Sequence, residues 1–222
     1  MKAKYSFWKE SIIYLIILIP FAVIYYFWND LPEQIPMHWN FAGEVDDWGT
    51  KTEGMGMLPL INIFLYILFL VVPRFDPKRE NYSLFDGAYY TIRLMIHLFI
   101  SSMLMVTLAY SLGYDINITR FVINYILILF IVIGNVLGNV RYNYTIGLRM
   151  PWTLASELVW RKTHRLASKL WVSSSLITIF AGLLLGEEML KYLFIANMGV
   201  ILVVPTVYSY LVFQEEKKGK TE

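Results

Sequence analysis

The sequence predicts an all-α integral membrane protein with six transmembrane helices, and three observations lead to this fold class. Of its 222 residues, 57% are apolar and 16% are charged, with a mean hydropathy of +0.52. Soluble domains average about 45–50% apolar and roughly 25% charged residues. Six stretches are long enough to cross a hydrocarbon core of about 30 Å, which takes roughly 20 residues of helix. Lys and Arg gather at alternate ends of these stretches, as they do in multi-pass proteins.

The spans are predicted from the apolar runs. The first run looks like a signal peptide, but it lacks a small-residue cleavage site and is long and aromatic, so we expect it to be retained. Pro73 is expected to end the second span. Pro205 is expected to kink the sixth, with neighbouring helices satisfying the freed backbone groups. Only "GEE" separates the last two spans, which predicts a tight antiparallel hairpin. The predicted spans are approximately 11–28, 55–72, 89–112, 121–140, 170–185 and 190–213.

The distribution of charge predicts that both termini are cytoplasmic, because Lys and Arg in short loops stay on that side. Of the 19 Lys and Arg residues, 15 fall at the two termini or in the loops after the second and fourth spans. The loop 29–54 is then external, and it is acidic. The 15 are Lys2, Lys4, Lys9, Arg74, Lys78, Arg79, Arg141, Arg149, Arg161, Lys162, Arg165, Lys169, Lys217, Lys218 and Lys220.

The segment 141–171 is basic and rich in tryptophan, and it contains a predicted helix start. Pro151 suits a first turn, and Thr153, Ser156 and Glu157 offer capping chemistry. We expect an amphipathic helix over about 153–165, lying in the membrane interface between spans four and five. Its tryptophans would sit at the headgroup level, and its basic side chains would face water or anionic lipid.

Asparagines near the end of the fourth span recur every four residues. Asn135, Asn139 and Asn143 would therefore share one helical face, beside Gly134 and Gly138. Such a face can form a close seam between helices. Alternatively, it can line a polar cavity that opens at the cytoplasmic end.

Two histidines each carry a structural and a functional interpretation. His164 follows Glu157 by seven residues, so the two would share a helix face. A carboxylate that orients a histidine is a proton-transfer arrangement, and it is also an ordinary structural hydrogen bond. His97 lies within the third span, where an ionisable group is a functional candidate or a neutral ring bonded to a neighbouring helix.

The stretch "RYNYTIGLRMPWTLASELVWRKTHRLASKLWV" resembles the SdpI family of bacterial membrane proteins. That family has the pattern R-x-N-x-x-x-G-I/L-R-x-P-W-T-L, followed by W-x-x-T-H and a K/W pair. A small residue, often Gly, usually follows the His motif, and here Ala167 or Ser168 takes its place. The matching residues are Arg141, Asn143, Gly147, Arg149, Pro151, Trp152, Thr153, Trp160, Thr163, His164, Lys169 and Trp171.

The external loop carries a second, independent resemblance. "LPEQIPMHWNFAGEVDDWGTK" is similar to a short domain of unknown function that often precedes the SdpI segment. We therefore expect two regions: 1–75, with the first span, the external loop and the second span, and 76–222, with the SdpI-like spans. The matching residues are Pro32, Pro36, His38, Trp39, Asn40, Gly43, Asp46, Asp47, Gly49 and Lys51.

The resemblance implies an immunity protein of the bacterial plasma membrane that protects the cell against a secreted killing peptide. It also implies a signalling role, in which the loaded protein captures a cytoplasmic repressor. Independently of the resemblance, the external loop has two interpretations. It could be an ordered cap whose aromatics Trp39, Phe41 and Trp48 pack on the membrane surface, or an acidic and aromatic surface that attracts a cationic amphipathic peptide. By analogy, the peptide would meet His38, Trp39, Asn40, Glu44, Asp46 and Asp47. The cytoplasmic or cavity-lining residues, facing repressor or lipid, would be Asn139, Asn143, Arg149, Trp152, Glu157, Trp160 and His164.

Two other classes of function stay open. A membrane hydrolase could cleave the peptide with a divalent metal such as zinc on His38, Glu44 and Asp47, although no metal-protease spacing is present. A transporter or lipid-binding protein could use the asparagine face. No Walker or G-x-S-x-G motif is present, so the sequence favours no catalytic residue and no cofactor. Cysteine is absent, which excludes disulfides and thiolate metal sites, and a net charge of +2 does not indicate a nucleic-acid partner.

Overall fold

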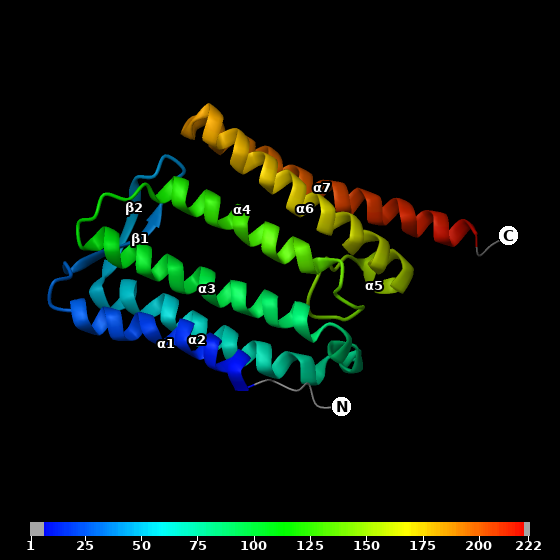
Figure 1. Cartoon of the computed structure of the whole chain (residues 1–222), viewed down its shortest axis with the longest axis horizontal. Helices are drawn as coiled ribbons and strands as arrows, with labels where there is room; N and C mark the ends of the chain where they lie inside the picture. The colour runs from blue at the N-terminus through cyan, green and yellow to red at the C-terminus, as the bar shows by residue number, and fades with distance from the viewer. Residues whose placement is uncertain (1–6, 220–222) are drawn as a thin grey trace. The chain divides into compact units, whose positions relative to one another are not determined.

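The computed structural model describes residues 7–219, and helices dominate this part of the chain (Figure 1). Six of the helices are long and apolar enough to cross a membrane, which confirms the six predicted spans. The long helices are α1 (Phe7–Phe27), α2 (Lys51–Phe75), α3 (Asp86–Ser111), α4 (Ile118–Leu137), α6 (Glu157–Leu185) and α7 (Glu187–Lys218). The shorter elements are β1 (Gln34–Trp39), β2 (Val45–Thr50), the 3₁₀ helix η1 (Arg79–Leu84) and α5 (Pro151–Ala155).

The chain forms two compact units, which are described separately. One contains residues 7–70 and 93–125, and the other contains 71–92 and 126–219. The first is called the hairpin unit below, because it holds β1 and β2. The second is called the motif unit, because it holds the SdpI-like sequence. Lys2, Lys4 and Lys220, which we expect on the cytoplasmic side, lie outside the described residues.

The strands are a departure from the expected all-α fold. β1 and β2 pair antiparallel, with irregular register on either side of His38. The strand signal was easy to miss because Pro36 lies inside β1, and proline is tolerated only at an edge or a bulge. A second departure is that α2 passes through Pro73 and ends at Phe75.

An apolar cluster attaches the β-hairpin to the helices of its unit. Ile35 on β1 is fully buried and packs with Leu31, Met55, Leu104 and Leu108. Gly54 makes this packing possible, because a Cβ atom at that position would lie 2.4 Å from the Ile35 side chain. The first turn of α2 therefore lies directly against the strand.

The hairpin unit also buries an ion pair between membrane-spanning helices. Both guanidinium nitrogens of Arg93 donate to the Glu10 carboxylate, at 2.8 and 2.9 Å. The Tyr66 hydroxyl donates to the same carboxylate at 2.8 Å. An ionic group inside a membrane protein is costly unless it is paired in this way. Glu10 and Arg93 stand 83 residues apart, so the chain sequence alone does not indicate that they pair.

Pro20 and Pro205 each lie inside a membrane-spanning helix and remove one backbone hydrogen bond. In both cases a side chain from another helix replaces the missing donor. Pro205 lacks an N–H, which leaves the Ile201 carbonyl without its helical donor, and the Trp171 indole N–H donates to that carbonyl at 3.2 Å. Pro20 leaves the Ile16 carbonyl free in the same way, and the Ser101 hydroxyl donates to it at 2.8 Å. These contacts confirm that a neighbouring helix satisfies the backbone group freed at Pro205.

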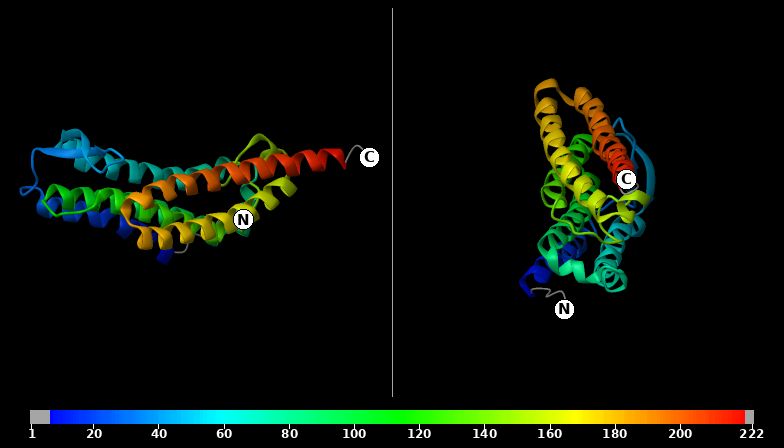
Figure 2. Two further views of the ribbon diagram at one scale, coloured as in Figure 1. Left: turned by 90° about the horizontal axis from the view of Figure 1, so that it is seen from above. Right: turned by 90° about the vertical axis from the view of Figure 1, so that its right-hand side faces the viewer.

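In the motif unit, α6 and α7 form the predicted antiparallel hairpin and run side by side (Figures 1 and 2). Gly186 alone separates them, and its φ of +87° is a conformation that other residues adopt with strain. At Gly182, an added Cβ would lie 2.5 Å from Leu190. The two helices are therefore in close contact from the turn onward.

The stretch 153–165, which we expect to form a separate interfacial helix, is divided between two helices. α5 is a single short turn, and α6 runs without a break from Glu157 through the fifth span. No helix breaker occurs between Arg165 and Leu170, so nothing ends the helix there. The break comes at Ser156, whose extended backbone and hydroxyl cap α6 by accepting a hydrogen bond from the Val159 N–H at 3.3 Å.

We predict that Trp171→Phe lowers the free energy of unfolding by about 1 kcal/mol, because the Ile201 carbonyl loses its donor. In a Pro205→Ala background, the residue 205 N–H can bond to that carbonyl, so Trp171→Phe should cost much less. A double-mutant cycle of unfolding in detergent measures the coupling. An equal cost of Trp171→Phe in both backgrounds would mean that this hydrogen bond does not compensate the proline.

Candidate functional site

The β-hairpin carries all six residues proposed to meet a peptide. Its turn is closed by hydrogen bonds from the Asn40 N–H to the Glu44 carbonyl and from the Gly43 N–H to the Asn40 carbonyl, both at 2.9 Å. Gly43 has a φ of +93°, and a Cβ there would lie 2.9 Å from the Thr119 hydroxyl. A glycine is needed at this point because the turn combines a left-handed backbone with a close approach.

Polar pairs organise the outer face of the hairpin. His38 Nδ1 and Asp46 Oδ1 are 2.6 Å apart, and both side chains are exposed. The Asn40 side chain donates to the Glu44 carboxylate and accepts from the Glu44 N–H, each at 3.0 Å. Asp47 is exposed beside them.

Aromatic side chains of the β-hairpin differ in exposure. Phe41 and Trp48 are each 52% exposed. Trp39 instead is half-buried and contacts Tyr110 edge to face, with ring centroids 5.7 Å apart. It lines a small apolar cavity of about 180 Å³, whose walls include Met37, Met57, Leu58, Met103, Val106 and Val122. Flexible methionines allow such a cavity to adapt to different apolar groups.

The structure does not assemble the alternative metal site of His38, Glu44 and Asp47. His38 is held by Asp46, whereas Glu44 is held by Asn40. Within residues 7–219, no three His, Asp or Glu side chains are grouped closely enough to hold a metal ion. The donors therefore do not fit the three-ligand sets of catalytic zinc sites.

In the motif unit, Asn143 shapes the loop that connects α4 to α5, residues 138–150, called the α4–α5 loop below. Its side-chain oxygen accepts from the N–H groups of Thr145 and Ile146, at 2.8 and 2.7 Å. Its amide donates to the carbonyls of Arg141 and Ile146. The expectation that Asn143 shares a helical face with Asn135 is wrong, because α4 ends at Leu137 and the asparagine makes a turn of its own.

Trp160 and His164 hold this loop against α6. Their rings stack with centroids 4.0 Å apart, and both side chains are buried. The Trp160 indole donates to the Val140 carbonyl at 3.0 Å. His164 Nε2 accepts from the Leu148 N–H at 3.0 Å, which leaves Nδ1 to donate to the Trp160 carbonyl at 2.8 Å. These two bonds require the neutral ring with its proton on Nδ1.

Gly147 completes the contact between loop and helix. Its φ is +122°, and a Cβ there would lie 2.4 Å from His164 Nε2. Thr153 of the P-W-T motif accepts from the Met150 N–H at 2.8 Å, which starts α5. Trp152 donates to the Ser209 hydroxyl on α7, while Arg149 stays exposed and donates to the Tyr144 carbonyl. Most of the motif residues therefore build the loop.

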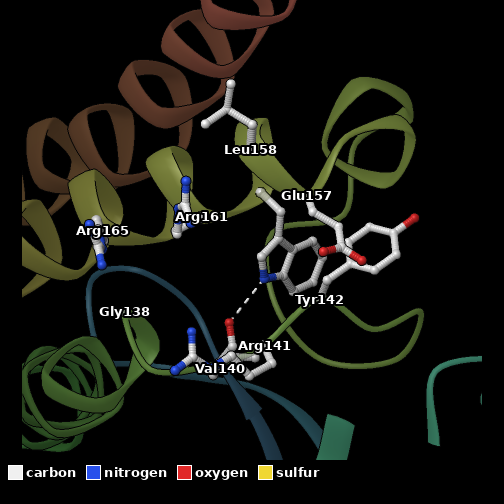
Figure 3. Close-up of a pocket in the computed structure, with 9 residues that line it drawn as sticks. Gly138, Val140, Arg141, Tyr142, Glu157, Leu158, Arg161 and Arg165 are labelled. Carbon is white, nitrogen blue, oxygen red and sulfur yellow. Dashed lines mark hydrogen bonds between the residues drawn. The ribbon is translucent and has the colours of Figure 1, made fainter. Parts of the chain in front are cut away.

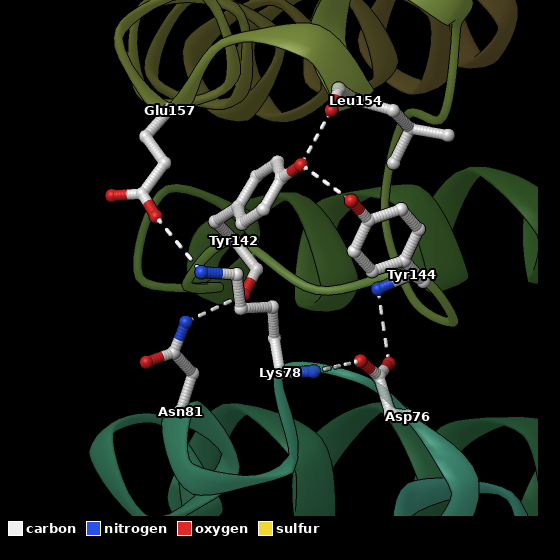
Figure 4. A network of polar contacts seen from close by, with 7 residues as sticks. All are labelled: Asp76, Lys78, Asn81, Tyr142, Tyr144, Leu154 and Glu157. Atoms are coloured by element: carbon white, nitrogen blue, oxygen red, sulfur yellow. Dashed lines mark hydrogen bonds and ion pairs between the residues drawn. The ribbon is translucent and has the colours of Figure 1, made fainter.

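Asp76 is the residue that sequence reasoning missed. It is buried, and its carboxylate accepts from the N–H groups of Lys78 and Tyr144 (Figure 4). It also accepts from the hydroxyls of Tyr82 and Thr145. Burial alone would raise the pKa of this carboxyl, but the four hydrogen bonds outweigh burial and hold it below its ordinary value. Asp76 thereby joins the α2–α3 connection to the α4–α5 loop.

Glu157 belongs to the same network and does not orient His164. Its carboxylate lies 3.7 Å from the Lys78 ammonium, which also stands over the Tyr142 ring (Figure 4). The Tyr142 hydroxyl donates to the Leu154 carbonyl, and burial with the neighbouring Tyr144 hydroxyl raises the pKa of Tyr142 to about 12. The contact between Glu157 and His164 that their spacing allowed, whether for proton transfer or as a structural hydrogen bond, is therefore not formed.

His97 is buried within its span and is hydrogen-bonded to Asn62 of the neighbouring helix α2. Its Nδ1 lies 2.6 Å from the Asn62 side-chain oxygen, and the Asn62 amide donates to the Ser101 hydroxyl at 3.0 Å. The ring is fully buried beside Tyr66 and Phe69. This agrees with the interpretation of a histidine bonded to a neighbouring helix.

Gly147→Ala should lower the free energy of unfolding by roughly 2–4 kcal/mol, because it adds both backbone strain and a clash with His164. Chemical unfolding in detergent measures the change. Gly199→Ala in α7 is the matched control, since no atom lies within 4 Å of a Cβ there, and it should cost nothing. Equal behaviour of the two variants would contradict the tight loop contact.

The lowered pKa of Asp76 predicts that this residue stabilises the fold at neutral pH and that acid removes the stabilisation. The ionised carboxylate stabilises the fold above the ordinary Asp pKa of about 3.9, and this contribution is lost as the pH falls through the lower folded pKa. The melting temperature of the wild type should therefore exceed that of Asp76→Asn at pH 7, and the gap should close in acid. A gap that does not change with pH would show that the charge of Asp76 is not what stabilises the loop.

Comparison with known proteins agrees with both motifs. Residues 15–63 match the domain of unknown function DUF1648, and residues 139–209 match the SdpI/YfhL protein family. The chain is 27% identical over 203 residues to the Immunity protein SdpI of Bacillus subtilis (strain 168), covering 91% of this chain and 95% of that protein. No solved structure matches. The chain is thus a multi-pass bacterial membrane protein in which a segment that matches DUF1648 precedes a segment that matches the SdpI/YfhL family, as its two motifs had indicated.

Proposed function

We propose that this protein is a membrane immunity protein that protects the cell against a secreted killing peptide, and that the β-hairpin receives the peptide. The similarity over most of its length to an immunity protein supports the role. We assign peptide binding to the β-hairpin because exposed acidic side chains lie there beside exposed aromatic side chains. Asp46 and Asp47 directly precede Trp48 on β2, and Phe41 lies at the turn.

The chemistry of this surface suits a cationic amphipathic peptide. Carboxylates attract and orient the basic groups, and exposed aromatic rings provide apolar contact area. The methionine-lined cavity beneath Trp39 offers a place for an apolar side chain once the peptide has docked. Binding at this surface would keep the peptide from the bilayer without cleaving it.

The proposal places the hairpin outside the cell and the two termini inside. The basic residues of the motif unit support this orientation, because the α2–α3 connection, the α4–α5 loop and the end of α7 lie together. Asp76 joins the α2–α3 connection to the α4–α5 loop. The hydroxyl of Ser156, which caps the start of α6, donates to Glu216 near the end of α7. Short loops with this excess of Lys and Arg stay cytoplasmic.

The resemblance also implies capture of a cytoplasmic repressor by the loaded protein. Within this proposal, exposed Arg149 is available for contact. Asn143, Trp160 and His164 are buried, so they would position the loop and not touch a partner.

The test is protection of a sensitive bacterium that expresses the protein, with the challenge peptide recovered for mass spectrometry. We expect survival with the peptide intact. Asp47→Asn combined with Trp48→Ser should weaken protection roughly tenfold or more, since an exposed tryptophan with an adjacent charge is a typical binding hot spot. Recovery of cleaved peptide would instead indicate a hydrolase.

Asp115→Asn combined with Tyr114→Ser is the matched control. Both residues are exposed in the α3–α4 connection of the same unit, and the pair removes the same charge and a similar aromatic group. This variant should protect like the wild type. Equal loss of protection in both variants would overturn the assignment of the peptide surface to the hairpin.

A further inference from the structure

Two adjoining cavities lie along α6 in the motif unit, and basic side chains dominate their walls. Their volumes are about 260 and 320 Å³, and they share Gly138, Arg141 and Arg165. Arg161 also lines the first cavity (Figure 3), and Lys169 also lines the second. We call this feature the basic groove, defined by Arg141, Arg161, Arg165, Lys169, Asn135 and Asn139.

The groove follows from the close approach of α4 to α6. The Ser168 hydroxyl donates to the Gly134 carbonyl at 2.6 Å, and a Cβ on Gly138 would lie 3.4 Å from Ser168. Arg161, Arg165 and Lys169 recur every four residues, so they share one face of α6. The α4–α5 loop, anchored by Trp160, brings Arg141 to the opposite wall (Figure 3).

The positive charge of the groove is not balanced by the protein. Glu157 is the only acid among the lining residues, and Lys78 already pairs with it at 3.7 Å. Within residues 7–219, none of the four basic side chains of the groove makes an ion pair. The three guanidinium groups and the ammonium that line these two adjoining cavities repel each other unless an anion separates them. Arginine forks and asparagine amides are suitable donors for the oxygens of a phosphate.

The position of the groove along α6 indicates where the phosphate comes from. The apolar run of the fifth span begins at Leu170, directly after Lys169, and Trp171 follows. Basic residues and tryptophan at the end of an apolar run mark the headgroup level of a bilayer, and basic pockets between membrane helices bind anionic headgroups. We propose that the basic groove binds the phosphate of an anionic phospholipid headgroup.

Titration calorimetry of the full chain in neutral detergent tests this site, with dihexanoyl phosphatidylglycerol as the probe. The zwitterionic probe dihexanoyl phosphatidylcholine and inorganic phosphate are titrated in parallel. Phosphatidylglycerol should bind at least about tenfold more tightly than either one. Arg141→Gln combined with Arg165→Gln should weaken its binding at least about tenfold, because charge-assisted contacts to the phosphate are lost.

Lys162→Gln combined with Arg79→Gln is the control, since it removes the same charge from exposed positions outside the groove. It should bind phosphatidylglycerol like the wild type. Equal weakening in both double variants would show that only diffuse surface charge attracts the lipid, and this overturns the site. Binding of inorganic phosphate as tight as that of phosphatidylglycerol would overturn the lipid assignment, as would the absence of phosphatidylglycerol binding. Unchanged melting temperatures of both variants exclude misfolding as the cause of any loss.

Discussion

The contact of His164 with the Leu148 N–H is the interaction on which the motif unit depends. It requires a neutral ring, a stacked Trp160 to hold the ring in place, and a glycine at 147 to leave room for Nε2. Once this contact is made, the α4–α5 loop lies against α6. Its outer surface then carries Arg141 at the wall of the groove and Arg149 at an exposed position. Buried motif residues such as Asn143, Trp160 and His164 thus position exposed motif residues, Arg141 and Arg149, at the surface.

Much of the helical framework could be predicted because its causes are local. The length and polarity of each apolar run identify a span, and a proline inside a span calls for a donor from another helix. The donors themselves could not be named, since Trp171 and Ser101 meet the freed carbonyls only after the helices pack. Asp76 was missed for the same reason, because its partners Tyr144 and Thr145 stand 68 and 69 residues away.

The errors in the sequence interpretation share a physical origin. Periodicity placed Asn143 on a helix, but the side chain of asparagine competes with the helix by bonding to nearby backbone groups. The amphipathic stretch 153–165 was read as a separate helix because its charges differ from those of the span that follows. Composition changes at Leu170, whereas backbone conformation does not, since helix formers continue across that point. Sequence alone also does not distinguish Trp39, which is half-buried against Tyr110, from the exposed Trp48.

The single-residue turn at Gly186 has a consequence for how the chain is made. With no loop between them, α6 and α7 cannot enter a bilayer one after the other with a soluble segment waiting in between. The two helices must therefore enter a bilayer together, as one helical hairpin. The turn between them carries Glu187 and Glu188, and Lys191 lies 3.8 and 2.8 Å from their carboxylates. Partial neutralisation by that lysine lowers the net charge at the point where the chain reverses.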